Sequence, residues 1–265
     1  MYTRFQLAKK YISYFISASN GKGHGVHSPF VFDFIIHVLN DKKEYPCYSE
    51  IENYRKALLK NEKVIEVEDF GAGSTILPYK QKRLKDIASS SLKPRKYAQL
   101  LFRIAQYYKS ETIVELGTSL GITSMYLASS PVNPEVYTLE GSSAVAQVAG
   151  ENFQKAQLDN IQLSLGSFEK TLPDLIQKIT KADLLFIDGN HRKKATLEYF
   201  ELFLSRNTNE SIFIFDDIHW SKEMEEAWQI IQEHPAVTLS IDLFFIGIVF
   251  FNPQFKVKQH FTIRF

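Results

Sequence analysis

The sequence predicts an α/β fold, with a doubly wound, mainly parallel β-sheet covered by helices on both faces. From residue 112 onward, short apolar runs alternate with helical stretches, which is typical of successive βαβ units. The short runs are almost continuously apolar, as strands buried on both faces of a parallel sheet are. Two later runs, 237–243 and 245–251, have only a short connection, so they must pair antiparallel.

The first ninety-three residues predict mainly helices. Residues 1–18 form an amphipathic pattern that the Asn-Gly-Lys-Gly run at 20–23 ends. Ser28 is the expected N-cap and Pro29 the first residue of a helix that reaches residue 39. Further helices are expected at 50–60, 80–91 and 94–108. We therefore divide the chain into an N-terminal helical extension or cap, residues 1–93, and a main domain, residues 94–265.

The elements of the main domain follow in strict order. Strands are expected near 112–116, 135–139, 161–165, 183–187 and 211–215. Helices are expected near 121–129, 142–157, 168–179, 191–204 and 221–233. Residues 256–263 are a further extended piece after the antiparallel pair.

Composition excludes several classes of protein. The net charge of +1 indicates no electrostatic attraction to nucleic acid or to an acidic membrane over the whole chain. One cysteine, Cys47, excludes an internal disulfide and a zinc site built from cysteines. The first residues lack the apolar core of a signal peptide, and no apolar run approaches the length of a membrane helix. We expect a cytoplasmic protein without nucleic-acid or membrane partners.

A glycine bend and an acid downstream of it indicate a nucleotide-type ligand. The strand at 112–116 turns through Gly117 and Gly121 into a helix, whose first N–H groups have no partner within the helix. Glu140 ends the next strand, 23 residues after Gly117. A carboxylate there can accept hydrogen bonds from both hydroxyls of a ribose. The combination predicts a nucleoside-containing cofactor.

A second glycine motif, Gly71 to Ser74, competes with the first. It follows an extended run, but no acid at the end of a following strand accompanies it. Glycines alone are weak evidence, and a preceding strand, a following helix and an acid downstream strengthen it. We assign the cofactor to the later motif and interpret the earlier one as a structural turn, or alternatively as a lid.

Five segments together resemble the class I S-adenosylmethionine (SAM)-dependent methyltransferases, in particular the small-molecule O-methyltransferases related to catechol O-methyltransferase. The segments are VELGTSLGIT at 114–123, LEG at 139–141, GS at 166–167, LFIDGNH at 185–191 and FDDIHW at 215–220. The resemblance covers roughly residues 95–255. It implies a Rossmann-like, doubly wound sheet of seven strands with an antiparallel last strand.

The resemblance also implies the residues of a SAM site. Glu115 and Gly117 would line the methionine end, Glu140 would bind the ribose hydroxyls, and Ser167 with Phe168 would border the adenine. The remaining positions expected at the cofactor are Thr118, Ser119, Gly121, Gly141 and Asp188. Ser119 replaces the second glycine of the common GxGxG form, as this branch often does.

Three acids are candidate metal ligands. Asp188 ends the fourth strand, and Asp216 and Asp217 end the fifth, at the edge of a parallel sheet where ligands bind. Clustered carboxylates repel one another unless a cation such as Mg²⁺ relieves them. In metal-dependent members of the resembling branch an Asp-Asn pair stands where this chain has Asp216 and Asp217. The alternative is that these acids cap the helices that follow.

The chemistry of methyl transfer needs a base for the acceptor. Asp188, His191 and His219 are the candidate catalytic residues, because each follows the end of a strand and the two imidazoles can accept a proton. The lysine that catechol-type enzymes use has no counterpart near residues 190–191. The N-terminal helices either cover the acceptor pocket or form a homodimer contact.

The sequence thus predicts a SAM-dependent methyltransferase acting on an oxygen of a small molecule, with assistance from a divalent metal as one possibility. Two alternatives stay open. One is an inactive cofactor-binding or regulatory module with the same fold, and the other is a nucleotide-dependent Rossmann enzyme.

Overall fold

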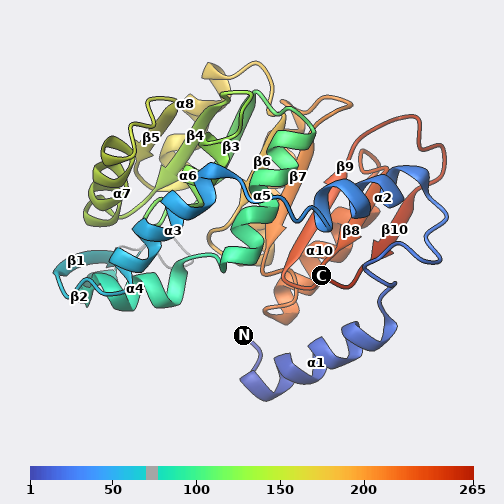
Figure 1. Cartoon of the computed structure of the whole chain (residues 1–265), viewed down its shortest axis with the longest axis horizontal. Helices are drawn as coiled ribbons and strands as arrows, with labels where there is room; N and C mark the ends of the chain where they lie inside the picture. Colours follow the sequence, from blue (N-terminus) through green and yellow to red (C-terminus); the bar gives the residue numbers. More distant parts are fainter. Residues whose placement is uncertain (70–76) are drawn as a thin grey trace. The chain divides into compact units, whose positions relative to one another are not determined.

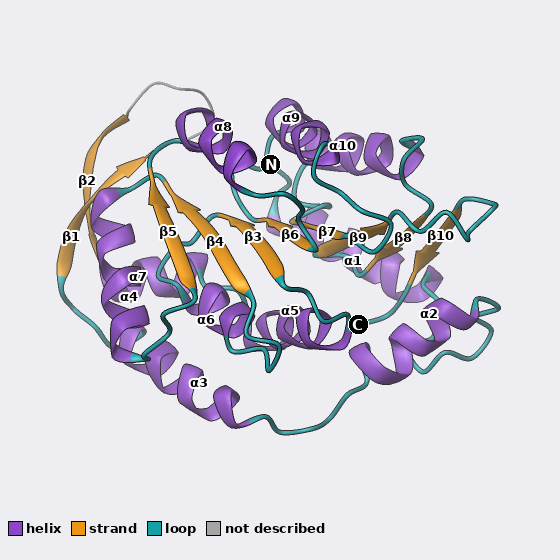
Figure 2. Cartoon of the chain, turned by 90° about the horizontal axis from the view of Figure 1, so that it is seen from above, coloured by secondary structure: helices purple, strands orange, loops and turns teal. Residues whose placement is uncertain are grey.

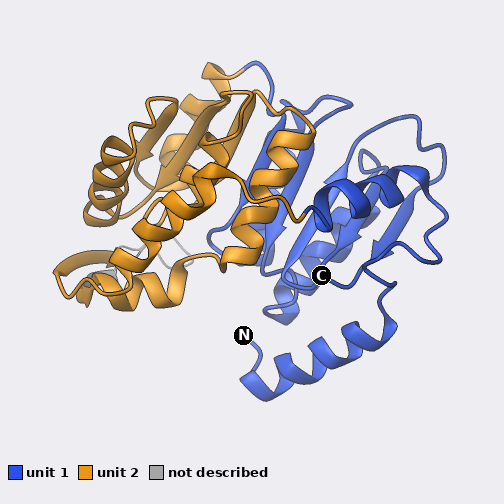
Figure 3. Ribbon diagram, in the orientation of Figure 1, with its two compact units in different colours: residues 1–41, 180–265 blue, residues 42–179 orange. Residues whose placement is uncertain are grey.

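The computed structural model describes residues 1–69 and 77–265, which form two compact units (Figures 1 and 3). Unit 1 consists of residues 1–41 and 180–265, and unit 2 of residues 42–179. The Gly71–Ser74 motif lies outside the described residues. The division into an extension and a main domain at residue 93 stays a prediction. Within the described ranges, no helix is both long and apolar enough to cross a membrane.

The sheet of unit 2 has three parallel strands. They are β3 (Thr112–Leu116), β4 (Glu135–Glu140) and β5 (Ile161–Leu165). The helices are α5 (Arg95–Tyr107), α6 (Ile122–Ala128), α7 (Ser143–Lys155) and α8 (Phe168–Lys178). Figure 2 shows α5 and α6 on one face of these strands and α8 on the other. The predicted βαβ alternation is confirmed here, and it brings the carboxyl ends of the three strands to one edge.

The first part of unit 2 corrects one predicted element. It contains α3 (Pro46–Leu58), the antiparallel hairpin of β1 (Val64–Asp69) and β2 (Leu77–Arg83), and α4 (Leu84–Ser91). The helix predicted at 80–91 therefore begins only at Leu84. Lys80 pairs with Val67 and Lys82 with Ile65 across the hairpin. Pairing with a distant strand has overridden the local helical preference of the lysines.

The sheet of unit 1 has five strands in the order β10-β8-β9-β7-β6. They are β6 (Leu184–Ile187), β7 (Ile212–Asp216), β8 (Leu239–Asp242), β9 (Ile246–Phe250) and β10 (Gln259–Thr262). β6 and β7 are parallel, whereas β9 is antiparallel to both of its neighbours, as predicted. The helices between these strands are α9 (Lys193–Leu204) and α10 (Lys222–Glu233).

The number of strands differs from the prediction. Apart from the β1–β2 hairpin, the described strands number eight, three in unit 2 and five in unit 1, instead of seven. The addition is β10, which pairs parallel with β8. Its sequence, Gln-His-Phe-Thr, has no apolar run, and only the backbone pairing with β8 makes it a strand.

Unit 1 also contains the first helices of the chain. They are α1 (Arg4–Ser17), α2 (Pro29–Phe34) and the π-helix η1 (Ile35–Leu39). Ser28 is the N-cap of α2, as predicted, and its hydroxyl accepts from the Val31 N–H. Phe30 and Phe34 contact the ring of Phe250 in β9, which fixes α2 on the sheet of unit 1.

Candidate active site

The glycine bend of unit 2 joins β3 to α6 in a backbone conformation that few residues adopt. Gly117, Ser119 and Gly121 all have positive φ, at 110°, 49° and 86°. A Cβ on Gly121 would lie 2.6 Å from the ring of Phe153, so both the conformation and the space require glycine. The N–H groups of Gly117 and Thr118 each donate to the Leu139 carbonyl at 3.1 Å and hold the bend against β4.

Glu140, at the end of β4, lies against this bend. One carboxylate oxygen accepts from the Ser119 N–H at 2.9 Å and the other from the Ser142 N–H at 3.0 Å. Burial raises the pKa of the Glu140 carboxyl above its usual 4.5, although these backbone donors favour the charged form. The Gly141 N–H also favours the charged carboxylate. Each carboxylate oxygen can accept more than one hydrogen bond, so Glu140 can still accept from a ribose hydroxyl.

Glu115 lies beneath the bend in a fully buried network of hydroxyls. The Thr138 hydroxyl donates to its carboxylate at 2.6 Å, and the Ser124 hydroxyl donates to the same oxygen. The hydroxyls of Thr118 and Thr138 are 2.6 Å apart. Since the Thr138 proton points to Glu115, Thr118 must be the donor of this pair. The chain of hydrogen bonds links the bend to both strands.

Sequence reasoning missed several contributors to this arrangement, including Ser124 and Ser142. The sequence does contain a signal for Thr138, because a hydroxyl in the middle of a buried strand needs a hydrogen-bond partner. Ser91, at the end of α4, lies with its Oγ 2.8 Å from the Ser119 Oγ, and no sequence pattern indicated this contact.

The expected adenine residues begin the next helix. Ser167 is the N-cap position of α8, and Phe168 is its first residue. The Gly166 N–H donates to the backbone carbonyl of Glu140 at 2.9 Å. Residues 166–168 are thereby tied to the end of β4, directly beside Gly141.

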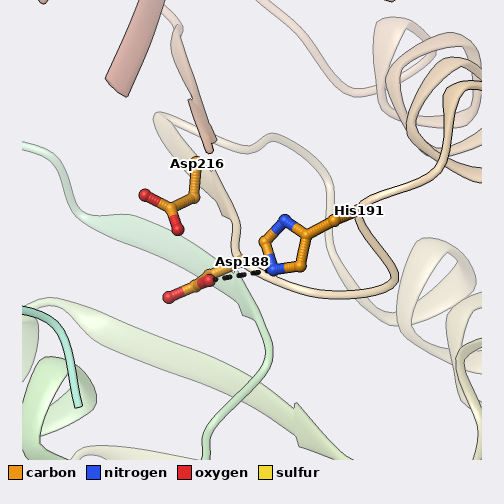
Figure 4. Close-up of side chains that lie close together, drawn as sticks. All are labelled: Asp188, His191 and Asp216. Carbon is orange, nitrogen blue, oxygen red and sulfur yellow. Dashed lines mark ion pairs between the residues drawn. The ribbon is translucent and has the colours of Figure 1, made fainter. Parts of the chain in front are cut away.

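A second cluster lies in unit 1, where β6 and β7 end. Ligand atoms of Asp188, His191 and Asp216 all lie within 4.8 Å of one another (Figure 4). The Asp188 Oδ1 is 3.6 Å from the His191 Nε2, and Asp216 is only 2% exposed. Two carboxylates and an imidazole are a donor set that suits a divalent ion.

Of the three predicted metal ligands, Asp188 and Asp216 lie together and Asp217 does not join them. In the described parts of the chain, Asp217 is not a member of this cluster. Its φ is 54°, and its N–H donates to the Phe245 carbonyl at 2.7 Å. The alternative that these acids cap helices is wrong, because α9 has Arg192 at its N-cap and α10 has Ser221.

His219 lies in a different network of unit 1. Its Nδ1 is 3.1 Å from Glu225 and its Nε2 is 2.8 Å from Asp242, so both ring nitrogens contact carboxylates. Burial opposes the charged imidazole, but hydrogen bonds and charge from Asp242 and then Glu225 hold its pKa above the usual 6.5. Lys10 of α1 also binds Glu225, at 2.9 Å. His219 thus connects β8, α10 and, through Glu225, α1.

Comparison with known families identifies the region that contains these residues. Residues 114–218 match the family model described as a methyltransferase domain. This part of the chain is therefore similar to a methyltransferase domain. The matched region includes the glycine bend, Glu140, and the cluster of Asp188, His191 and Asp216, and the predicted resemblance to methyltransferases is confirmed.

Solved structures share the fold of the methyltransferase domain and of much of the remaining chain. A methyltransferase of Podospora anserina bound to S-adenosylhomocysteine (SAH) has a TM-score of 0.60 at 14% identity, covering 95% of this chain and 97% of its own. An O-methyltransferase of Bacillus cereus in complex with SAH has a TM-score of 0.56 at 20% identity, with coverage of 83% and 97%. The O-methyltransferase TomG of Streptomyces achromogenes, in complex with SAM, has a TM-score of 0.57 at 16% identity, with coverage of 83% and 94%.

Proposed function

We propose that this chain binds SAM and transfers its methyl group to an oxygen of a small molecule. The observation that carries the proposal is the contact between Glu140 and the Ser119 N–H, which places a carboxylate against the glycine bend. The fold neighbours solved with SAM or SAH, including TomG and the Bacillus cereus enzyme, support the choice of cofactor.

The residues of unit 2 would hold the cofactor by simple hydrogen bonding. The Glu140 carboxylate, which backbone N–H groups hold against the bend, would accept hydrogen bonds from the ribose hydroxyls. Glu115 and Gly117 would line the methionine end, and Ser167 with Phe168 would border the adenine. The buried threonine pair beneath the bend would keep its backbone in place before the cofactor arrives.

The residues of unit 1 would prepare the acceptor. Asp188 and Asp216 would hold a divalent ion such as Mg²⁺, which lowers the pKa of a hydroxyl that binds it. His191, 3.6 Å from Asp188, would accept the proton of the acceptor hydroxyl. When bound, SAM would supply the methyl group, whose bond to sulfur would be exchanged for a bond to the acceptor oxygen, giving an O-methylated product and SAH. We assign His219 a structural role and not a catalytic one, because carboxylates contact both of its ring nitrogens.

Two measurements test the proposal. Calorimetry with SAH and with NAD⁺ should detect binding of SAH alone, and binding of NAD⁺ alone would favour a nucleotide-dependent Rossmann enzyme. Transfer from labelled SAM to a panel of phenols, sugars and carboxylic acids, with and without Mg²⁺, should detect a methylated product. SAH binding without transfer to any acceptor class would favour an inactive cofactor-binding module.

A further inference from the structure

Helix α1 exposes a stripe of large apolar side chains to solvent. Phe5, Ile12 and Ile16 are 81%, 59% and 73% exposed, and Phe15 beside them is 48% exposed. The spacing of i, i+7 and i+11 places Phe5, Ile12 and Ile16 on one face of the helix. We call Phe5, Ile12, Phe15 and Ile16 the α1 stripe. Single exposed apolar residues need no explanation, but a continuous stripe of this kind marks an interaction surface.

The opposite face of α1 is firmly attached to unit 1. The Tyr14 hydroxyl donates to the Ile263 carbonyl, and its ring centroid lies 5.2 Å from that of Phe244. Lys10 pairs with Glu225, and the Arg264 guanidinium donates to the Ile16 carbonyl at 3.2 Å. These contacts hold the middle and the C-terminal end of α1 (blue in Figure 1) on unit 1, whereas the side chains of the α1 stripe stay exposed.

The charges around the stripe have one sign. Arg4–Ser17 contains no acidic residue, and its cations are Arg4 and Lys9 together with Lys10, which pairs with Glu225 on the attached face. The guanidinium of Arg264 also lies over the Phe15 ring, 4.9 Å from its centroid. A partner that covers the stripe must therefore offer apolar groups together with negative charge.

We propose that the α1 stripe binds a membrane surface that contains anionic phospholipids. A basic helix with an apolar face lies in the plane of such a surface, with its apolar side chains among the acyl chains and its cations near the phosphates. A second copy of this chain is a poorer partner. Packing of two α1 stripes would gather the cations of both helices in one interface, and Arg4–Ser17 offers no acid to compensate them.

This proposal replaces the expectation that the protein has no membrane partner. That expectation depended on the net charge of +1, which averages acids and bases over all 265 residues. Peripheral binding depends instead on the charge and apolar area of one helix. The proposal does not depend on methyl transfer, so either can fail without the other.

Sedimentation with lipid vesicles tests the proposal. The full chain should sediment with vesicles of phosphatidylcholine and phosphatidylglycerol, but not with phosphatidylcholine alone, and salt should weaken the binding. The double variant Ile12→Glu/Ile16→Glu should bind roughly tenfold or more weakly, because two apolar contacts are lost and two negative charges are added. Lys9→Gln should weaken the binding less than the double variant does.

The matched control is Val257→Glu, the same kind of change at an apolar residue that is 74% exposed and lies away from α1. It should bind the vesicles as the unchanged chain does. Circular dichroism should show that all variants keep the native helix content. No sedimentation with anionic vesicles, or equal binding by the double variant, would overturn the proposal. So would a dimer in analytical ultracentrifugation that the double variant abolishes in the absence of any vesicle binding.

Discussion

Replacing Glu140 by Gln tests the ribose assignment with little change in shape. In the structure the two carboxylate oxygens accept from the N–H groups of Ser119 and Ser142, at 2.9 and 3.0 Å. A glutamine has one acceptor oxygen, so its NH₂ would face one of these donors. Hydrogen bonds to a charged group contribute about 1.5–3 kcal/mol and neutral ones about 0.5–1.5 kcal/mol. We expect SAH binding to weaken by about 1–3 kcal/mol, which is about 5- to 150-fold in Kd.

The assay is isothermal titration calorimetry with SAH, and Glu135→Gln is the control. Glu135 lies at the other, exposed end of β4 and accepts only from the Tyr137 hydroxyl among the contacts described for it. It should bind SAH as the unchanged protein does. Burial raises the pKa of Glu140, so this carboxylate is protonated at a higher pH than an ordinary one. As the pH is lowered, the SAH affinity of the unchanged protein should therefore begin to fall at a higher pH than an ordinary carboxyl would cause. Unchanged SAH affinity in a folded Glu140→Gln protein, or an equal loss in Glu135→Gln, would refute the reasoning.

Three further predictions follow from the networks. Thr138→Val should lower the free energy of unfolding by about 1–3 kcal/mol and weaken SAH binding, whereas Thr138→Ser should preserve both, as denaturant titration and calorimetry can check. Asp216→Asn should reduce Mg²⁺-dependent methyl transfer about tenfold or more, whereas Asp217→Asn should change the rate by less than about twofold; equal effects would contradict the cluster. The raised pKa of His219 means that its stabilising effect is present below its unfolded pKa of ~6.5 and is lost as pH rises through the folded value. His219→Gln should therefore flatten the pH dependence of stability above pH ~6.5, and a profile as steep as that of the unchanged protein would contradict the network.

Local sequence was sufficient for most of the elements. The strands β3, β4, β6 and β7 are mainly apolar runs and β5 alternates apolar with polar residues, and both patterns differ from the periodicity of the helices between them. The antiparallel pairing of β9 with β8 followed from a connection too short for any crossover. The hairpin strand β2 was predicted as part of a helix, because its pairing with β1, and not its own residue pattern, makes it a strand. The extended segment expected at 256–263 contains β10, and the structure adds its parallel pairing with β8.

The sequence by itself determined the methyltransferase resemblance, the glycine bend, and the acid that the next strand brings to it. These follow from spacing along one chain, since the ends of parallel strands meet at one edge of a sheet. The tertiary structure decided which side chains of that edge share a cluster. It grouped His191 with Asp188 and Asp216, engaged both nitrogens of His219 with carboxylates, and placed Thr138 beneath the bend. Such choices depend on the direction of each side chain and on packing between distant segments, and a linear pattern carries no information about either.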